Sequence, residues 1–105
     1  MLDAEVMRVS VREANESLES LPNIGTECAA VLRRVGIATA ADLRSMGSVE
    51  AALRIRRALG ADAVCRNRMA ALEGAIRSVR WHRIPKPERD RLWTELERRS
   101  PSGSR

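Results

Sequence analysis

The segment from Leu21 to Gly47 constrains the fold more than any other part of this 105-residue chain. It contains two closely spaced signals for a turn followed by a helix: Pro22–Gly25 before Thr26, and Gly36 before a T-x-x-D start at Thr39. An apolar turn that ends at a helix N-terminus, where unpaired N–H groups can face an anion, is typical of helix-hairpin-helix modules. The segment therefore predicts a helix-hairpin-helix-like element.

Apolar residues elsewhere also recur at helical spacing. The clearest series has spacings of four, three, four and three, and its members are Cys65, Met69, Leu72, Ile76 and Val79. We expect a central core helix here, capped by Asp62. Gly74 inside it indicates the close approach of a neighbouring helix, because glycine costs about 1 kcal/mol against alanine in a helix interior.

The sequence predicts an all-α fold, a compact bundle of five to six short helices. The expected helices cover residues 3–20, 26–35, 39–46, a segment from a cap at Ser48 to a stop at Gly60, 62–79, and a last helix starting with Pro87. In the last helix Leu92, Trp93 and Leu96 are expected on the buried side. The predicted organisation is an N-terminal acidic helix (1–20), a helical domain (21–99) and a disordered tail (100–105).

Composition and the distribution of apolar residues limit the cellular locations that we expect for the protein. No apolar run approaches the length needed to span a membrane, and the charged N-terminus is not a signal peptide. The two cysteines, Cys28 and Cys65, are expected to be small buried apolar residues rather than a disulfide or a metal pair. We expect a cytoplasmic protein without a membrane partner.

The net charge of +5 is unevenly distributed: residues 1–27 carry −4 and residues 28–105 carry +9. A basic surface is what nucleic-acid binding needs. However, 18 of the 19 bases are Arg and 15 residues are Ala, as expected of a GC-rich coding sequence. Arginines also lie beside acids at helical spacing, as in Arg91–Glu95 and Glu95–Arg99, which favours solvated helix faces.

Five segments resemble a known family when taken together. LPNIG, VLRRVGI, T-x-x-DLRSMG, ALEGAIRSVRW and RDRLWTEL occur in this order between Leu18 and Leu96. They resemble the C-terminal domain of TfoX/Sxy, bacterial regulators of natural competence, most specifically at Leu21–Gly25 and Leu72–Trp81. The resemblance implies a non-catalytic helical domain that regulates DNA uptake through DNA or protein contacts. Longer family members carry a separate N-terminal α/β domain, so we expect a stand-alone C-terminal domain preceded by an acidic helix.

The hairpin turn holds the candidate contact residues. DNA-binding hairpins usually place glycines on both sides of an apolar residue, which lets backbone N–H groups approach a phosphate. Here Asn23 stands at the first position; it tolerates left-handed geometry, but its side chain would crowd a phosphate or bond the same N–H groups. Glu27 would repel a phosphate. The candidate phosphate, DNA or partner contacts are Asn23, Ile24, Gly25, Thr26, Arg33, Arg34 and Arg44. A hairpin that only joins two packed helices fits the residues equally well.

No catalytic, metal or cofactor site is predicted. The single histidine, His82, follows Trp81 in a turn without a nucleophile at a recognisable spacing, and no metal-ligand cluster or glycine-rich phosphate loop is present. Both tryptophans are expected to anchor the core rather than to stack on bases. We therefore predict a non-catalytic regulatory interaction module that contacts a protein partner, with weak, sequence-tolerant DNA backbone binding as the alternative. The charge asymmetry also favours a homodimer.

Overall fold

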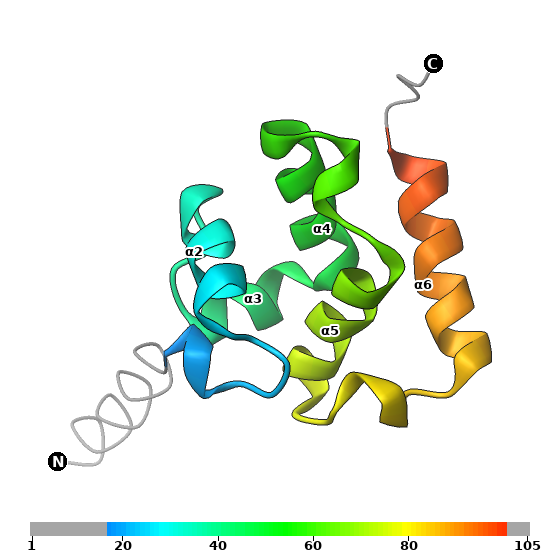
Figure 1. Cartoon of the computed structure of the whole chain (residues 1–105), viewed down its shortest axis with the longest axis horizontal. Helices are drawn as coiled ribbons and strands as arrows, with labels where there is room; N and C mark the ends of the chain where they lie inside the picture. Colours follow the sequence, from blue (N-terminus) through cyan, green and yellow to red (C-terminus); the bar gives the residue numbers. More distant parts are fainter. Residues whose placement is uncertain (1–16, 101–105) are drawn as a thin grey trace, which may run out of the picture.

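The computed structural model describes residues 17–100, which form five α-helices and three 3-10 turns and contain no strand (Figure 1). The helices are α2 (Thr26–Arg34), α3 (Ala40–Met46), α4 (Ser48–Leu59), α5 (Arg66–Arg77) and α6 (Lys86–Arg99), and the turns are η1 (Leu18–Ser20), η2 (Ala61–Ala63) and η3 (Trp81–Arg83). The predicted all-α fold is confirmed. Most of the predicted helix over 3–20 and the tail after Ser100 lie outside the described residues; Ser17, where the description begins, is extended (φ −69°, ψ 142°).

Helix α5 is the centre of the bundle, as its apolar period predicted. It contacts α3, α4, α6 and η3. In Figure 1, α2 and α3 lie on one side of α4 and α5, and α6 runs along the opposite edge. The fold therefore places the hairpin region and the C-terminal helix on different sides of one central helix.

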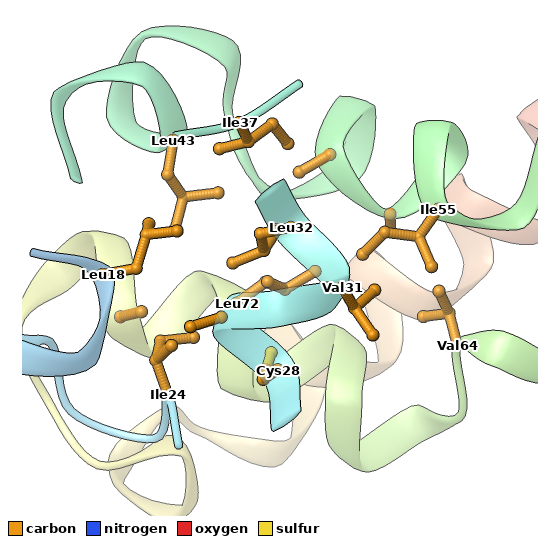
Figure 2. Close-up of a cluster of buried hydrophobic side chains, with 14 of the residues drawn as sticks. Leu18, Ile24, Cys28, Val31, Leu32, Ile37, Leu43, Ile55, Val64 and Leu72 are labelled. Carbon is orange, nitrogen blue, oxygen red and sulfur yellow. The ribbon is translucent and has the colours of Figure 1, made fainter. Parts of the chain in front are cut away.

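Aliphatic side chains from every helix form the core, and Figure 2 shows part of it around Leu32 and Leu72. The largest fully buried side chains are Leu18, Leu32, Ile37, Leu43, Leu53, Ile55, Val64, Met69, Leu72, Ile84 and Leu96. Both tryptophans are only partly buried, so they anchor the edge of the core rather than its centre.

The central helix is shorter than the predicted 62–79. Val64 is extended (φ −127°, ψ 108°) and buried, so the chain leaves η2 before α5 begins. Asp62 therefore lies in η2, and Cys65 becomes the N-cap of α5 with an exposed side chain. The prediction that Cys65 is a core residue is wrong, whereas Cys28 is buried as expected. At the other end Ser78 takes a left-handed conformation (φ 64°) and ends the helix.

The cap of α4 also differs from the prediction. Gly47, with a φ of 88°, is the N-cap, and Ser48 is the first helical residue. The Ser48 side chain is buried, and its Oγ donates a hydrogen bond of 2.5 Å to Glu73 Oε1 on α5. Ser48 therefore joins two helices instead of closing the end of one.

Helix α6 begins one residue earlier than predicted, with Pro87 as its second residue. Its Leu96 is fully buried, while Leu92 and Trp93 are half-buried against the core. The guanidinium of Arg56, 8% exposed, lies 5.1 Å from the Trp93 ring centroid and bonds Glu97 Oε2. α6 is the longest helix of the described residues, at 14 residues, and none of these helices is long and apolar enough to cross a membrane.

Candidate interaction groove

The hairpin turn is tied to the far end of α5 by the side chain of Asn23. The Asn23 backbone is left-handed (φ 70°), as predicted. Its Nδ2 donates a 2.9 Å hydrogen bond to the Val79 carbonyl, and its Oδ1 accepts a 3.2 Å bond from the Trp81 N–H. The expectation that this amide would bond the N–H groups of the following helix is therefore wrong, since the amide is directed toward α5 and η3.

Gly74 makes this contact possible. A Cβ at Gly74 would lie 2.5 Å from Asn23 Nδ2, 2.6 Å from the Val79 carbonyl oxygen and 3.3 Å from Trp81 Cα. The predicted close approach is present, but the neighbours belong to a turn and a loop rather than to a helix. The segments Leu21–Gly25 and Leu72–Trp81 are thus in direct contact, and we call this contact between Asn23, Gly74, Val79 and Trp81 the hairpin lock.

Beside the hairpin lock lies a groove of about 680 Å³ between the starts of α2 and α5. We call it the interaction groove. It is lined by Asn23, Gly25, Thr26, Glu27, Cys28, Cys65, Asn67, Arg68, Ala71, Arg80, Trp81 and His82. A neighbouring hollow, lined by Ser20–Gly25 and Arg80, shares three of these residues.

Both helices begin at the interaction groove without a side-chain cap. The N-cap of α2 is Gly25 and that of α5 is Cys65, and neither provides a side-chain hydrogen bond. The first N–H groups of a helix have no partner within the helix and carry part of its positive dipole charge. Two such helix starts therefore offer hydrogen-bond donors to the same groove.

Two arginines line the groove: Arg68, which makes an ion pair, and Arg80, which makes none with the described residues. Arg68 Nη2 donates to Glu27 Oε1, and its Nη1 donates 3.1 Å to the Ala63 carbonyl. The expected repulsion from Glu27 is therefore reduced by a cation that the sequence reasoning missed. Arg80 is exposed, lines the groove and makes no ion pair with the described residues. The groove thus keeps an available positive charge.

An aromatic pair forms another part of the wall. His82 is exposed and lies edge-on to Trp81, with ring centroids 6.0 Å apart. The guanidinium of Arg89 lies 5.4 Å from the Trp81 ring centroid, which holds the half-buried indole in place by a cation–π contact. This wall is apolar beneath and polar at its rim.

The cysteines of the groove differ in exposure. Cys28 is buried, and burial raises the pKa of its thiol, while Cys65 is exposed. Within residues 17–100 no group of three or more His, Cys, Asp or Glu side chains is arranged to hold a metal ion.

The structure separates the predicted contact residues. Asn23, Gly25 and Thr26 line the interaction groove, whereas Ile24 is buried in the core. The predicted arginines, Arg33, Arg34 and Arg44, do not line this groove. Only the hairpin half of the predicted set therefore lies at the groove.

Arg33 and Arg34 lie at the opposite end of α2 from Gly25. Arg33 makes a bidentate ion pair with Glu19 at 2.8 and 2.9 Å. Arg44 on α3 is directed to the end of α5, where it bonds the Ile76 carbonyl at 3.5 Å. The cations at the groove are instead Arg68 and Arg80; the nearest sequence signal for Arg80 is its place beside Trp81.

Most arginines of residues 17–100 make ion pairs within the chain. The paired ones are Arg33, Arg54, Arg56, Arg57, Arg66, Arg68, Arg77, Arg98 and Arg99. On α6, Glu95 pairs with Arg98, and Arg99 reaches Glu50 on α4. Hydrogen bonding from Arg98 lowers the pKa of Glu95, as expected of a carboxylate in an ion pair. This pairing supports the interpretation of the arginines as solvated helix faces.

Comparison with known proteins identifies the family. The profile of the TfoX C-terminal domain matches residues 14–96, which include the hairpin lock and the interaction groove. The chain belongs to the TfoX C-terminal domain family. No curated protein matches this TfoX C-terminal domain.

Two crystal structures from Listeria monocytogenes are similar to it. An uncharacterized protein in a triclinic form is 36% identical, with a TM-score of 0.71, and the match covers 77% of this chain and 90% of that one. A protein of unknown function in a tetragonal form is 35% identical, with a TM-score of 0.70, covering 78% and 98%. These similarities support the family fold and assign no ligand.

Proposed function

We propose that this TfoX C-terminal domain is a non-catalytic regulatory module that binds a protein partner through the interaction groove. The observation that carries the proposal is the meeting of two uncapped helix starts beside the unpaired Arg80. N–H groups and a nearby guanidinium suit a carboxylate of a partner protein. On the basis of the family, the process we propose is regulation of competence or of transcription.

The composition of the groove favours a protein over DNA. Its walls combine Ala71 and the half-buried Trp81 with a few donors, as protein-binding sites commonly do. Binding of DNA depends on many arginines that neutralise phosphates. Here nine of the fifteen arginines of residues 17–100 already pair with acids, and of the two arginines that line the groove only Arg80 makes no ion pair with the described residues.

The alternative is weak, sequence-tolerant DNA binding through the hairpin. Its support is the same pair of open helix starts, since backbone N–H groups at a helix N-terminus also bind phosphate. Arg80, rather than Arg33, is the cation that the groove supplies. This alternative predicts an affinity for DNA that depends steeply on salt concentration.

A salt titration with a short DNA duplex tests the alternative. Phosphate binding predicts measurable affinity at low salt that falls steeply as salt rises, and Arg80→Ala should reduce the salt slope by about one. Arg34→Ala is the matched control, because Arg34 is an exposed arginine at the other end of α2. Absence of binding at low salt removes the DNA alternative.

Site-specific photo-crosslinking tests the main proposal. A photoreactive residue at His82, on the groove, should capture a protein partner in cells of the native organism, and Arg80→Glu should reduce the capture. The same residue at Thr94, exposed on α6, is the control position. Equal capture from both positions, unaffected by Arg80→Glu, contradicts the proposed role of the groove.

A further inference from the structure

The turn between α5 and α6 carries three arginines that take no part in the ion pairs of the chain. Arg80, Arg83 and Arg89 make no ion pair with the described residues, whereas nine other arginines do. Arg80 precedes η3, Arg83 ends it, and Arg89 lies in the first turn of α6 (Figure 1, yellow and the start of orange). We call these three residues the η3 arginine cluster. We infer that the cluster binds an acidic segment of the partner protein, an inference that rests on the proposed function.

The acids that follow this turn in the sequence are held by other cations. Glu88 pairs with Arg77 at 2.8 Å, and Asp90 pairs with Lys86 at 2.9 Å. Residues 78–87 contain no Asp or Glu. The positive charges of the cluster therefore repel one another without a neutralising carboxylate from the turn itself. Carboxylates supplied by a partner relieve this repulsion.

Hydrogen bonds and one ring contact gather the cluster around Trp81. The Arg83 N–H donates a 2.9 Å bond to the Arg80 carbonyl, so these two residues lie within one turn of each other. Arg89 Nε donates a 2.9 Å bond to the Ile84 carbonyl, and its guanidinium lies 5.4 Å from the Trp81 ring centroid. Its two Nη groups make no hydrogen bond with the described residues. A guanidinium oriented in this way loses little freedom when it binds a carboxylate through two parallel hydrogen bonds.

The aromatic ring at the centre of the cluster favours a peptide over a nucleic acid. Arg89 lies over the half-buried Trp81, so the indole offers no free face there for a base to stack on. Three arginines also engage few phosphates, so a duplex would bind this turn only weakly. Glutamate side chains suit the turn better, because their carboxylates pair with guanidinium groups and their methylene groups pack on an indole edge.

The cluster is continuous with the interaction groove. Arg80 belongs to both, and Trp81 and His82 line the groove from the same turn. An extended segment advances about 3.3 Å per residue, so a few residues of a partner suffice to pass from the groove along η3. The groove then receives one part of the partner, and the cluster selects partners whose adjoining residues are acidic.

Fluorescence anisotropy with a labelled hexaglutamate peptide tests the inference on the whole chain. At low salt the wild type should bind this peptide, and a hexaglutamine peptide should bind about tenfold more weakly. Arg83→Gln should weaken hexaglutamate binding about two- to fivefold, the effect of losing one exposed ion pair. The Arg83 side chain makes no hydrogen bond with the described residues, so this substitution changes the charge without removing a contact of the fold. Arg34→Gln and Arg91→Gln, which remove exposed arginines elsewhere, should leave the affinity unchanged.

Four results overturn the inference. Absence of hexaglutamate binding at low salt removes the site, and equal losses in Arg83→Gln and the two control variants show attraction to net charge alone. Tighter binding of an oligonucleotide with six phosphates assigns the cluster to nucleic acid instead. A dimer in light scattering that dissociates in Arg83→Gln assigns it to a second copy of the chain.

The test separates this inference from the proposed function. Capture of a partner at His82 that Arg80→Glu reduces and Arg83→Gln leaves unchanged refutes the acidic segment alone. Hexaglutamate binding that depends on Arg83, without groove-dependent capture in cells, refutes the proposed function alone.

Discussion

Helix α3 and helices α2 and α5 begin in opposite ways. At α3, Thr39 Oγ1 accepts a 3.1 Å hydrogen bond from the Asp42 N–H, and Asp42 Oδ2 accepts a 3.2 Å bond from the Thr39 N–H. Asp42 also accepts from the Ala38 N–H. At α2 and α5 the N-caps, Gly25 and Cys65, provide no such bond. One helix start is closed by its own side chains, and the other two are open.

The two uncapped helix starts lie at the interaction groove. Their N-caps, Gly25 and Cys65, line this groove together with Arg80. A capping box contributes local stability and occupies the donors that a ligand would need. Helices α4 and α6 also begin without a side-chain cap, so α2 and α5 are distinguished by the groove that their uncapped starts share.

The largest expected effect on the free energy of unfolding comes from the core that supports both the capped and the uncapped helix starts. Leu72 on α5 is fully buried in the core, so Leu72→Ala should lower the free energy of unfolding by about 2–5 kcal/mol. Urea unfolding followed by circular dichroism measures this. A loss well below that range would mean that the core under the groove collapses around the cavity.

The hairpin lock, which sets the position of the α2 start, gives the next effect. Alanine favours a helix interior over glycine by about 1 kcal/mol, but the Cβ of Gly74→Ala would overlap Asn23 and Val79. We expect a net loss of about 1–3 kcal/mol in the free energy of unfolding. Adding Asn23→Gly removes the overlap with Nδ2 but not with the Val79 carbonyl, so recovery should be partial. A Gly74→Ala protein more stable than the wild type would refute the lock.

The comparison of helix starts is tested directly by two threonine substitutions. Thr39→Ala removes the capping box and should cost about 1 kcal/mol. Thr26→Ala alters the first residue of α2, where no side-chain cap exists, and should change the free energy of unfolding by less than about 0.5 kcal/mol. Equal losses in the two variants would show that α2 is capped in solution after all.

Local sequence signals predicted the local structure well. The T-x-x-D start at Thr39 and the left-handed Asn23 both depend on residues within one turn of each other, and both were found. The start of α5 was misplaced because Cys65 fits the apolar period of the helix, and periodicity alone does not show that Val64 is extended and already fills the core. An apolar period thus locates a helix more reliably than its first residue.

The candidate site was only half predictable, because its contacts join distant parts of the chain. Gly74 indicated a close approach, but nothing near it in the sequence names Asn23, 51 positions earlier, as the neighbour. The pairing of Arg68 with Glu27 is equally remote. The predicted arginines lay close to the hairpin in sequence, yet a nine-residue helix carried Arg33 to its other end.

The smallest expected effect concerns that other end of α2. Arg33 hydrogen-bonds Glu19, and with help from Ser17 this lowers the pKa of Glu19 from 4.5 to about 2. A carboxylate with a lowered pKa in the folded state stabilises the fold above its unfolded-state pKa, and the contribution is lost as the pH falls toward the folded-state value. The α2 end that is closed by an ion pair should therefore respond to acid.

Glu19→Gln should lower the urea midpoint slightly at about pH 6, and the difference from the wild type should shrink to a minor fraction by about pH 2.5. The effect is small because both side chains are exposed to solvent. Asp62→Asn is the matched control, since Asp62 is exposed and makes no ion pair with the described residues; it should leave the difference between the two pH values unchanged. A Glu19→Gln effect that persists in full at the lower pH would mean that the substitution acts through packing or the Ser17 cap, and that the ion pair does not close this end of α2.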